Sequence, residues 1–154
     1  MTLKMGNMRL RSSAFEPHKR IPDRYSGYGD NVSPALEWTG PPGGVKEFAL
    51  ICHDPDAPLP RGFTHWVIYG IPPTATGIPE GGGKAFTEGV NGAGKPGYFG
   101  PMPPAGHGPH HYYFWVYAVD KELKLKAGLD REACLRSIED HVIEMARLIG
   151  TYEK

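Results

Sequence analysis

The sequence contains little cysteine and carries no net charge. Cys52 and Cys134 are its only cysteines, too few for a disulfide scaffold or a cysteine-ligated zinc cluster. Each lies in an apolar stretch, so we predict two buried thiols in a reducing compartment. Lys plus Arg and Asp plus Glu both number 17. No excess of positive charge is available to gather nucleic acid or anionic lipid, although a small local anion site remains open.

Long apolar runs are also absent. No window approaches the ~20 apolar residues of a membrane-spanning helix, so we expect no integral membrane association. The first ten residues contain no apolar stretch of signal-peptide length, which favours a cytoplasmic protein. The 154 residues suffice for one ordinary domain, and we expect a single domain over residues 1–154.

Glycine and proline, by contrast, are abundant, with 21 and 16 residues. They supply 19 of the 39 residues from Pro72 to His110. The same stretch holds Tyr98, Phe99 and a cluster of histidines and prolines, and it joins two strongly apolar segments. Long loops inside compact domains are uncommon and are often functional, so we interpret it as a functional loop instead of a linker.

Three apolar segments rich in β-branched and aromatic residues predict strands over residues 47–53, 64–71 and 111–119. Their near-continuous hydrophobicity indicates a central sheet that is covered on both faces. Residues 35–38 predict a further short strand between two turns. The fold class is therefore mostly β, with few peripheral helices.

One helix is expected near the C-terminus, with Asp130 as its N-cap. Behind this residue, apolar side chains recur at spacings of 4, 4, 3 and 4, which predicts one helical stripe with Gly150 as its end. The stripe consists of Cys134, Ile138, Val142, Met145 and Ile149. Residues 148–152 fit a short closing strand equally well.

Common catalytic signatures are missing. Residues 81–84 resemble a phosphate loop only superficially, because Ala85 replaces the hydroxyl residue and no helical pattern follows. There is no G-x-S-x-G elbow and no C-x-x-C pair.

Three other motifs could carry chemistry. Residues 54–58 place Asp54 and Asp56 in a corner stiffened by prolines. His65 begins the second predicted strand, and alternation puts it on one face with Val67 and Tyr69. Residues 100–112 combine rigid prolines with glycines, and they deliver His110 and Tyr112 to one face of the third strand.

Each motif alone has an ordinary structural explanation. The aspartates could cap a turn, His65 could be a hydrogen-bonded core residue, and the loop could be a surface connector. Together they adjoin central strands, where polar side chains are costly unless they face a pocket.

Taken together, these blocks resemble the phosphatidylethanolamine-binding protein family, in the bacterial branch related to Raf kinase inhibitor proteins. The similarity rests on residues 54–58, His65-Trp66 and residues 100–112, and residues 31–38 also match the bacterial pattern. It extends from about Phe15 to Tyr152.

The resemblance implies a β-sandwich-like fold with a small pocket for an anion such as phosphate or a phosphorylated head group. It assigns Asp54, Asp56, His65, Met102, His110 and Tyr112 to ligand binding, and Pro58, Gly100, Pro101, Pro103, Pro104 and Gly106 to the shape of the pocket. Met102 replaces a glycine whose backbone N–H faces the ligand in animal relatives. We also expect no C-terminal helix of the kind that closes the pocket in animal members.

Imidazolium, tyrosine hydroxyl and backbone N–H groups all donate to anionic oxygens. The aspartates would keep His65 or His110 protonated, or would receive the ammonium group of a zwitterionic ligand. Phosphate affinity is then expected to weaken as pH rises. We expect a non-enzymatic binding protein without a cofactor. We expect no metal either: His107, His110 and His111 with an aspartate could ligate zinc, but alternation sends His110 and His111 to opposite faces.

Two alternatives remain open at this point. The first is a hydrolase of small phosphate or carboxylate esters, although the three blocks offer no serine or cysteine nucleophile. The second is a protein-interaction module of kinase-inhibitor type, which only the relatives suggest. A protein partner and a homodimer also stay open.

Overall fold

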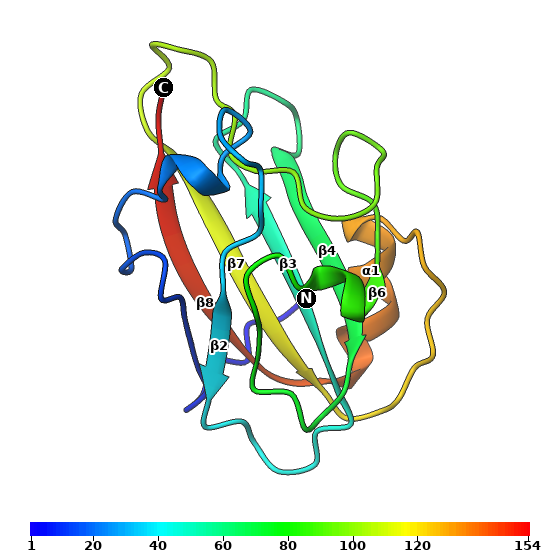
Figure 1. Cartoon of the computed structure of the whole chain (residues 1–154). Coiled ribbons are helices and arrows are strands. Elements are labelled where there is room, and N and C mark those ends of the chain that lie inside the picture. The colour runs from blue at the N-terminus through cyan, green and yellow to red at the C-terminus, as the bar shows by residue number, and fades with distance from the viewer.

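The computed structural model describes all residues, 1–154. Two antiparallel sheets form the framework of the fold, with the smaller sheet in front of the larger one in Figure 1. The strands are β1 (Arg9–Arg11), β2 (Leu36–Thr39), β3 (Glu47–Asp54), β4 (Phe63–Ile71), β5 (Gly77–Ile78), β6 (Thr87–Glu88), β7 (His110–Val119) and β8 (Val142–Tyr152). The helices are α1 (Arg131–Ile138) and three 3-10 turns, η1 (Asp23–Tyr25), η2 (Gly83–Ala85) and η3 (Glu139–His141).

The larger sheet has the strand order β6-β4-β3-β7-β8. Its three central strands are those predicted from the sequence, and each observed boundary lies within one residue of the prediction. The short strand predicted near residue 35 is β2. The mostly-β fold class is confirmed.

Apolar clusters cover both faces of the larger sheet, as the continuous hydrophobicity of its strands predicted. On one face, alternate residues of β3 and β7 pack under the smaller sheet, whose strand order is β1-β2-β5. This first core cluster includes Phe48, Leu50, Trp66, Phe114 and Trp38. On the other face, α1 contributes Cys134 and Ile138 to a second core cluster with Ile51, Val67 and Tyr69.

The predicted C-terminal helix is correct at its start and too long at its end. Asp130 is the N-cap, and its carboxylate accepts a hydrogen bond of 2.8 Å from the Ala133 N–H. The helix stops at Ile138, and the remaining residues of the predicted stripe lie on β8, paired along its length with β7. The alternative prediction of a closing strand is therefore closer to the structure than a helix that continues to Gly150, although the strand begins at Val142 instead of residue 148.

The outer edge of β8 is covered by the first part of the chain. The Lys4 carbonyl accepts a hydrogen bond from the Met145 N–H, and residues 18–21 form three more with Ile149 and Thr151, one of them from the His18 N–H to the Ile149 carbonyl. Isolated parallel bridges at Met5 and Arg20 mark the same two contacts. The sheet thus ends in irregular chain on this side and not in an open strand edge.

Both cysteines are buried and unpaired, as predicted. Burial raises the pKa of the Cys134 thiol to about 12, and it also raises that of Cys52. None of the helices has both the length and the apolar character that crossing a membrane requires.

Candidate binding pocket

A cavity of about 230 Å³ opens at the end of the larger sheet where β3 ends and where β4 and β7 begin. Two connections complete it, the acidic loop (residues 54–62) and the pocket loop (residues 99–104). The lining residues are Asp54, Ala57, Pro58, Leu59, Phe63, His65, Phe99, Met102, Pro103, Pro104, His110 and Tyr112. The three motifs far apart in the sequence therefore do meet around one cavity.

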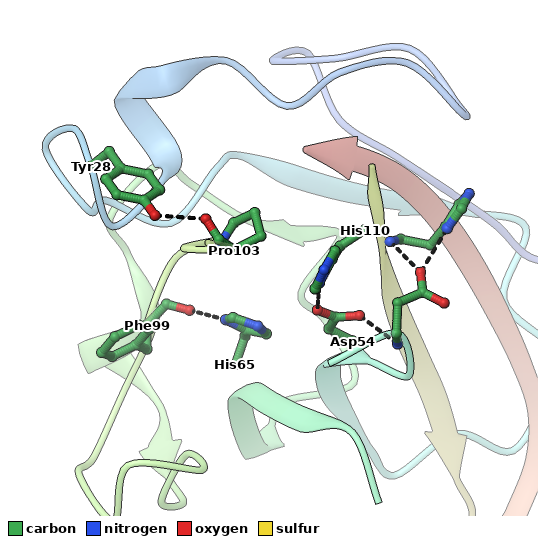
Figure 2. Close-up of polar contacts among 8 residues, drawn as sticks. Tyr28, Asp54, His65, Phe99, Pro103 and His110 are labelled. Carbon is green, nitrogen blue, oxygen red and sulfur yellow. Dashed lines mark hydrogen bonds and ion pairs between the residues drawn. The ribbon is translucent and has the colours of Figure 1, made fainter. Parts of the chain in front are cut away.

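A buried pair of Asp54 and His110 forms one wall of the cavity. His110 Nδ1 lies 2.7 Å from Asp54 Oδ2, and the two side chains are 6% and 3% exposed (Figure 2). The other carboxylate oxygen accepts a hydrogen bond of 2.7 Å from the Asp56 N–H. Burial raises the pKa of Asp54, and the hydrogen bonds from His110 and the Asp56 N–H oppose this effect. The pair fixes the orientation of the imidazole ring.

A β-bulge brings His65 into the cavity, where simple alternation would not place it. Trp66 pairs with Cys52, whereas Thr64 pairs with His53, so His65 is the extra residue of β4. Such a bulge re-aims a side chain. The His65 ring consequently packs edge-on against Tyr112, at 5.1 Å between centroids.

The predicted grouping of His65 with Val67 and Tyr69 on one face is therefore wrong. Val67 and Tyr69 belong to the second core cluster, on the α1 side. Tyr112 belongs to the first core cluster, on the opposite face of the sheet.

The Phe99 carbonyl accepts a hydrogen bond from His65 Nδ1, which holds the ring against the pocket loop (Figure 2). Burial lowers the pKa of His65 to about 4, more than this hydrogen bond raises it. His65 is therefore neutral at neutral pH. The expectation that a carboxylate keeps His65 protonated is wrong, because no carboxylate is bonded to this ring and Asp54 is bonded to His110 instead.

Tyr112 is 1% exposed, and its hydroxyl forms no hydrogen bond within the protein. Burial raises its pKa, so the hydroxyl keeps its proton and can donate it to a ligand. The prediction that His110 and Tyr112 share one face of β7 agrees with the structure, since both line the cavity.

The pocket loop is held in place by residues 25–31, a segment that lies outside the three sequence motifs. Three hydrogen bonds join the two: Gly100 N–H to Asn31 Oδ1 (2.6 Å), Gly27 N–H to the Pro101 carbonyl (2.8 Å) and Tyr28 hydroxyl to the Pro103 carbonyl (2.6 Å). Figure 2 shows the last of these beside the cavity. Asn31 adopts a positive φ of 56°, a conformation that asparagine tolerates better than most residues.

Asp56, which was expected to line the pocket, faces away from it. Its Oδ2 accepts hydrogen bonds from the backbone N–H and from Nδ1 of His111, both at 2.7 Å. Burial acts to raise the pKa of Asp56, but these hydrogen bonds lower it overall. Asp56 therefore anchors the acidic loop to His111 of β7 and does not line the cavity.

The other predicted residues divide into two groups. Pro58, Met102, Pro103 and Pro104 line the cavity, whereas Gly100, Pro101 and Gly106 lie outside its lining. Gly100 and Pro101 act on its shape through their bonds to residues 25–31. Met102 stands at the rim, 47% exposed, with its side chain against Gly27.

Four lining residues were missed: Ala57, Leu59, Phe63 and Phe99. Phe63 packs against His65 at 4.8 Å between ring centroids, so it helps to fix the imidazole together with Tyr112. An aromatic residue two positions before a strand histidine was the available signal. No group of three or more His, Cys, Asp or Glu side chains is arranged to hold a metal ion.

The low pKa of His65 predicts a loss of stability in acid. The unfolded chain takes up a proton near the ordinary pKa of 6.5, whereas folded His65 resists protonation down to about 4. The contribution of neutral His65 to the free energy of unfolding is therefore complete above pH 6.5. It decreases as the pH falls from 6.5 to about 4, by about 3 kcal/mol in total for a pKa shift of this size. Urea unfolding at several pH values measures it, and a His65→Phe variant with the same slope as the parent would contradict it.

Comparison with known proteins settles the family. The family model described as phosphatidylethanolamine-binding protein matches residues 11–153. This chain belongs to the phosphatidylethanolamine-binding protein family. A relative from Methanothermobacter thermautotrophicus, named only as a UPF0098 protein, is 45% identical over 153 residues, covering 96% of this chain and 99% of the relative.

Solved structures of the phosphatidylethanolamine-binding protein family agree in fold. One from Chlamydia trachomatis, titled a putative homolog of this family, is 38% identical with a TM-score of 0.89, over 96% of this chain and 97% of its own. Escherichia coli YbcL, titled a new member of the mammalian family, is 29% identical with a TM-score of 0.90, over 97% and 99%. The relationship thus spans the whole sandwich and its pocket-forming loops.

Proposed function

We propose that this protein binds a small phosphate-bearing ligand in the cavity and does not transform it. The observation that carries the proposal is the convergence of Asp54, His65, His110 and Tyr112, all nine-tenths buried or more, on one open cavity. Buried polar side chains are costly unless they are satisfied, and a polar ligand would satisfy those left without a partner.

The groups around the cavity suit a phosphate. Tyr112 presents an unpartnered hydroxyl, and the Met102 backbone N–H has no partner among the hydrogen bonds of the chain. Both can donate to phosphate oxygens. A volume of about 230 Å³ accommodates a phosphate and a short substituent, and it lies below the ~300 Å³ at which pockets for drug-sized ligands begin.

The absence of an activated nucleophile at the cavity supports binding without chemistry. No serine, threonine or cysteine lines it, and Cys52 is sealed in the core with a raised pKa. The buried Asp54–His110 pair nevertheless has the form of a base held by a carboxylate, which keeps ester hydrolysis as the second candidate.

Calorimetric titration with inorganic phosphate and with phosphorylethanolamine tests the proposal. The two probes share the phosphate and differ in the ammonium arm, so they separate free phosphate from a head group as the ligand. We expect saturable binding of at least one, and Tyr112→Phe is expected to weaken it about tenfold, since one hydrogen bond to a charged group is worth about 1.5 kcal/mol.

Tyr113→Phe is the matched control, because Tyr113 is the next residue of β7 and points to the opposite face of the sheet. Its affinity is expected to equal that of the parent. Binding of neither probe up to about 10 mM would refute the proposal. Release of phosphate from phosphorylethanolamine in the same samples would instead favour the hydrolase.

A further inference from the structure

We propose that His65 selects the protonated form of the bound phosphate group, so that the cavity takes a monoanion carrying one P–OH and rejects an oxyanion that has no proton. This inference rests on the proposed function and specifies which state of the ligand the same site recognises. It is carried by the hydrogen bond to Phe99 and by the position of the other ring nitrogen.

The contact with Phe99 fixes the tautomer of His65. A carbonyl oxygen only accepts hydrogen bonds, so Nδ1 must carry the proton that it donates to Phe99. In a neutral ring the proton is then absent from Nε2. This nitrogen consequently offers a lone pair and cannot donate to an anionic oxygen.

The only hydrogen bond of the His65 ring uses Nδ1, so none reaches Nε2, although the Gly100 backbone also lies near the ring and the residue is only 4% exposed. Among side-chain polar atoms without a hydrogen bond, only Trp66 Nε1 is fully enclosed by protein. His65 Nε2 also lacks a hydrogen bond but is not enclosed, so a ligand in the cavity that His65 lines can touch it. A ligand that brings a hydrogen-bond donor satisfies this lone pair, whereas a ligand that brings only acceptors leaves it buried beside a second acceptor.

The surrounding groups strengthen the same preference. Asp54, on β3, places a carboxylate at the cavity and makes a doubly charged ligand costly. His110 and Tyr112 face the cavity from β7, and neither is hydrogen-bonded to His65. His53, the remaining titratable neighbour, is bonded to Thr64 through Nδ1. Burial holds the pKa of His65 near 4, so the ring stays an acceptor throughout the physiological range.

Methyl phosphate and methyl sulfate provide a matched pair of probes. Near pH 5.5 methyl phosphate is mainly a monoanion with one P–OH, since phosphate monoesters lose the second proton near pH 6. Methyl sulfate has the same charge and a similar shape but no proton. We expect the protein to bind methyl phosphate at least ~10-fold more tightly, as a site rejects an analogue that leaves its buried polar group unpaired.

The outcomes separate the two proposals. Equal affinities, or tighter sulfate binding, overturn the role of His65 and leave phosphate binding intact. Binding of neither probe overturns the proposed function and this inference with it. A preference for methyl phosphate that persists in His65→Phe assigns the selection to another group and overturns the inference as well.

A measurement on the unaltered protein covers the case in which His65→Phe does not fold. In ¹⁵N-labelled protein, the unprotonated Nε2 of His65 gives its own resonance. We expect methyl phosphate to shift this resonance as Nε2 accepts a hydrogen bond, and methyl sulfate to leave it unchanged. Identical responses to the two probes contradict the proposal.

Discussion

Gly100→Ala is expected to destabilise the protein by about 3 kcal/mol or more, because an added methyl group has no room there. A Cβ at this position would lie 2.2 Å from the Tyr25 carbonyl oxygen and 2.9 Å from Asn31 Oδ1. The first is a backbone atom and cannot rotate away, so the pocket loop must separate from residues 25–31. Urea unfolding measures the loss, and phosphate titration is expected to show a matching loss of affinity.

Two other glycines serve as graded controls. Around Gly43 a Cβ meets nothing within 4 Å and φ is ordinary, so Gly43→Ala is expected to be neutral. Gly106 also has open space but a φ of +82°, so alanine there should cost about 1 kcal/mol through backbone strain alone. If Gly100→Ala unfolds at the same urea concentration as Gly43→Ala, the fastening of the pocket loop has been misjudged.

Asp54→Asn is expected to cost about 2–4 kcal/mol, since it leaves a buried donor without an acceptor. Both carboxylate oxygens of Asp54 accept a hydrogen bond, one from the Asp56 N–H and one from His110. An asparagine supplies one acceptor oxygen and turns an NH₂ group toward the other donor. Equilibrium unfolding measures the cost, and the released His110 ring is expected to weaken phosphate binding.

Asp56→Asn is the matched control two residues away. Both of its contacts with His111 reach a single oxygen, which the amide oxygen can replace. The two side chains are 41% and 45% exposed, and exposed ion pairs contribute about 0–1 kcal/mol. The comparison fails if the two variants lose the same stability, because burial would then not distinguish the two Asp–His pairs.

Local sequence was sufficient for the three central strands, because each is a bounded run of β-branched and aromatic residues. It was insufficient at the C-terminus, where β8 is buried on both faces and its apolar residues do not alternate. Val142, Met145 and Ile149 therefore fell by coincidence on a helical spacing that Cys134 and Ile138 had begun. These residues form a strand because they pair with β7, and this long-range interaction cannot be predicted from local helical spacing.

The site was predictable to the extent that its residues come from recognisable blocks. The blocks marked His110 and Tyr112, but they could not show that Asp56 turns to His111, since that contact joins residues 55 positions apart. The bulge that brings His65 into the cavity could not be predicted from alternation either. One extra residue in β4 changes the face of the sheet to which the side chains before the bulge point.

The covering of β8 by residues 4–21 restricts how copies of this chain can associate. Unpaired strand edges are the usual route by which sheets recruit a further strand from a neighbour. Here one margin is already occupied by the chain's own beginning, and the opposite margin, β6, offers only Thr87 and Glu88. A sheet that continues from one molecule into the next through β8 would require residues 4–21 to detach from this strand. Association without such a rearrangement must therefore use the faces and loops of the sandwich.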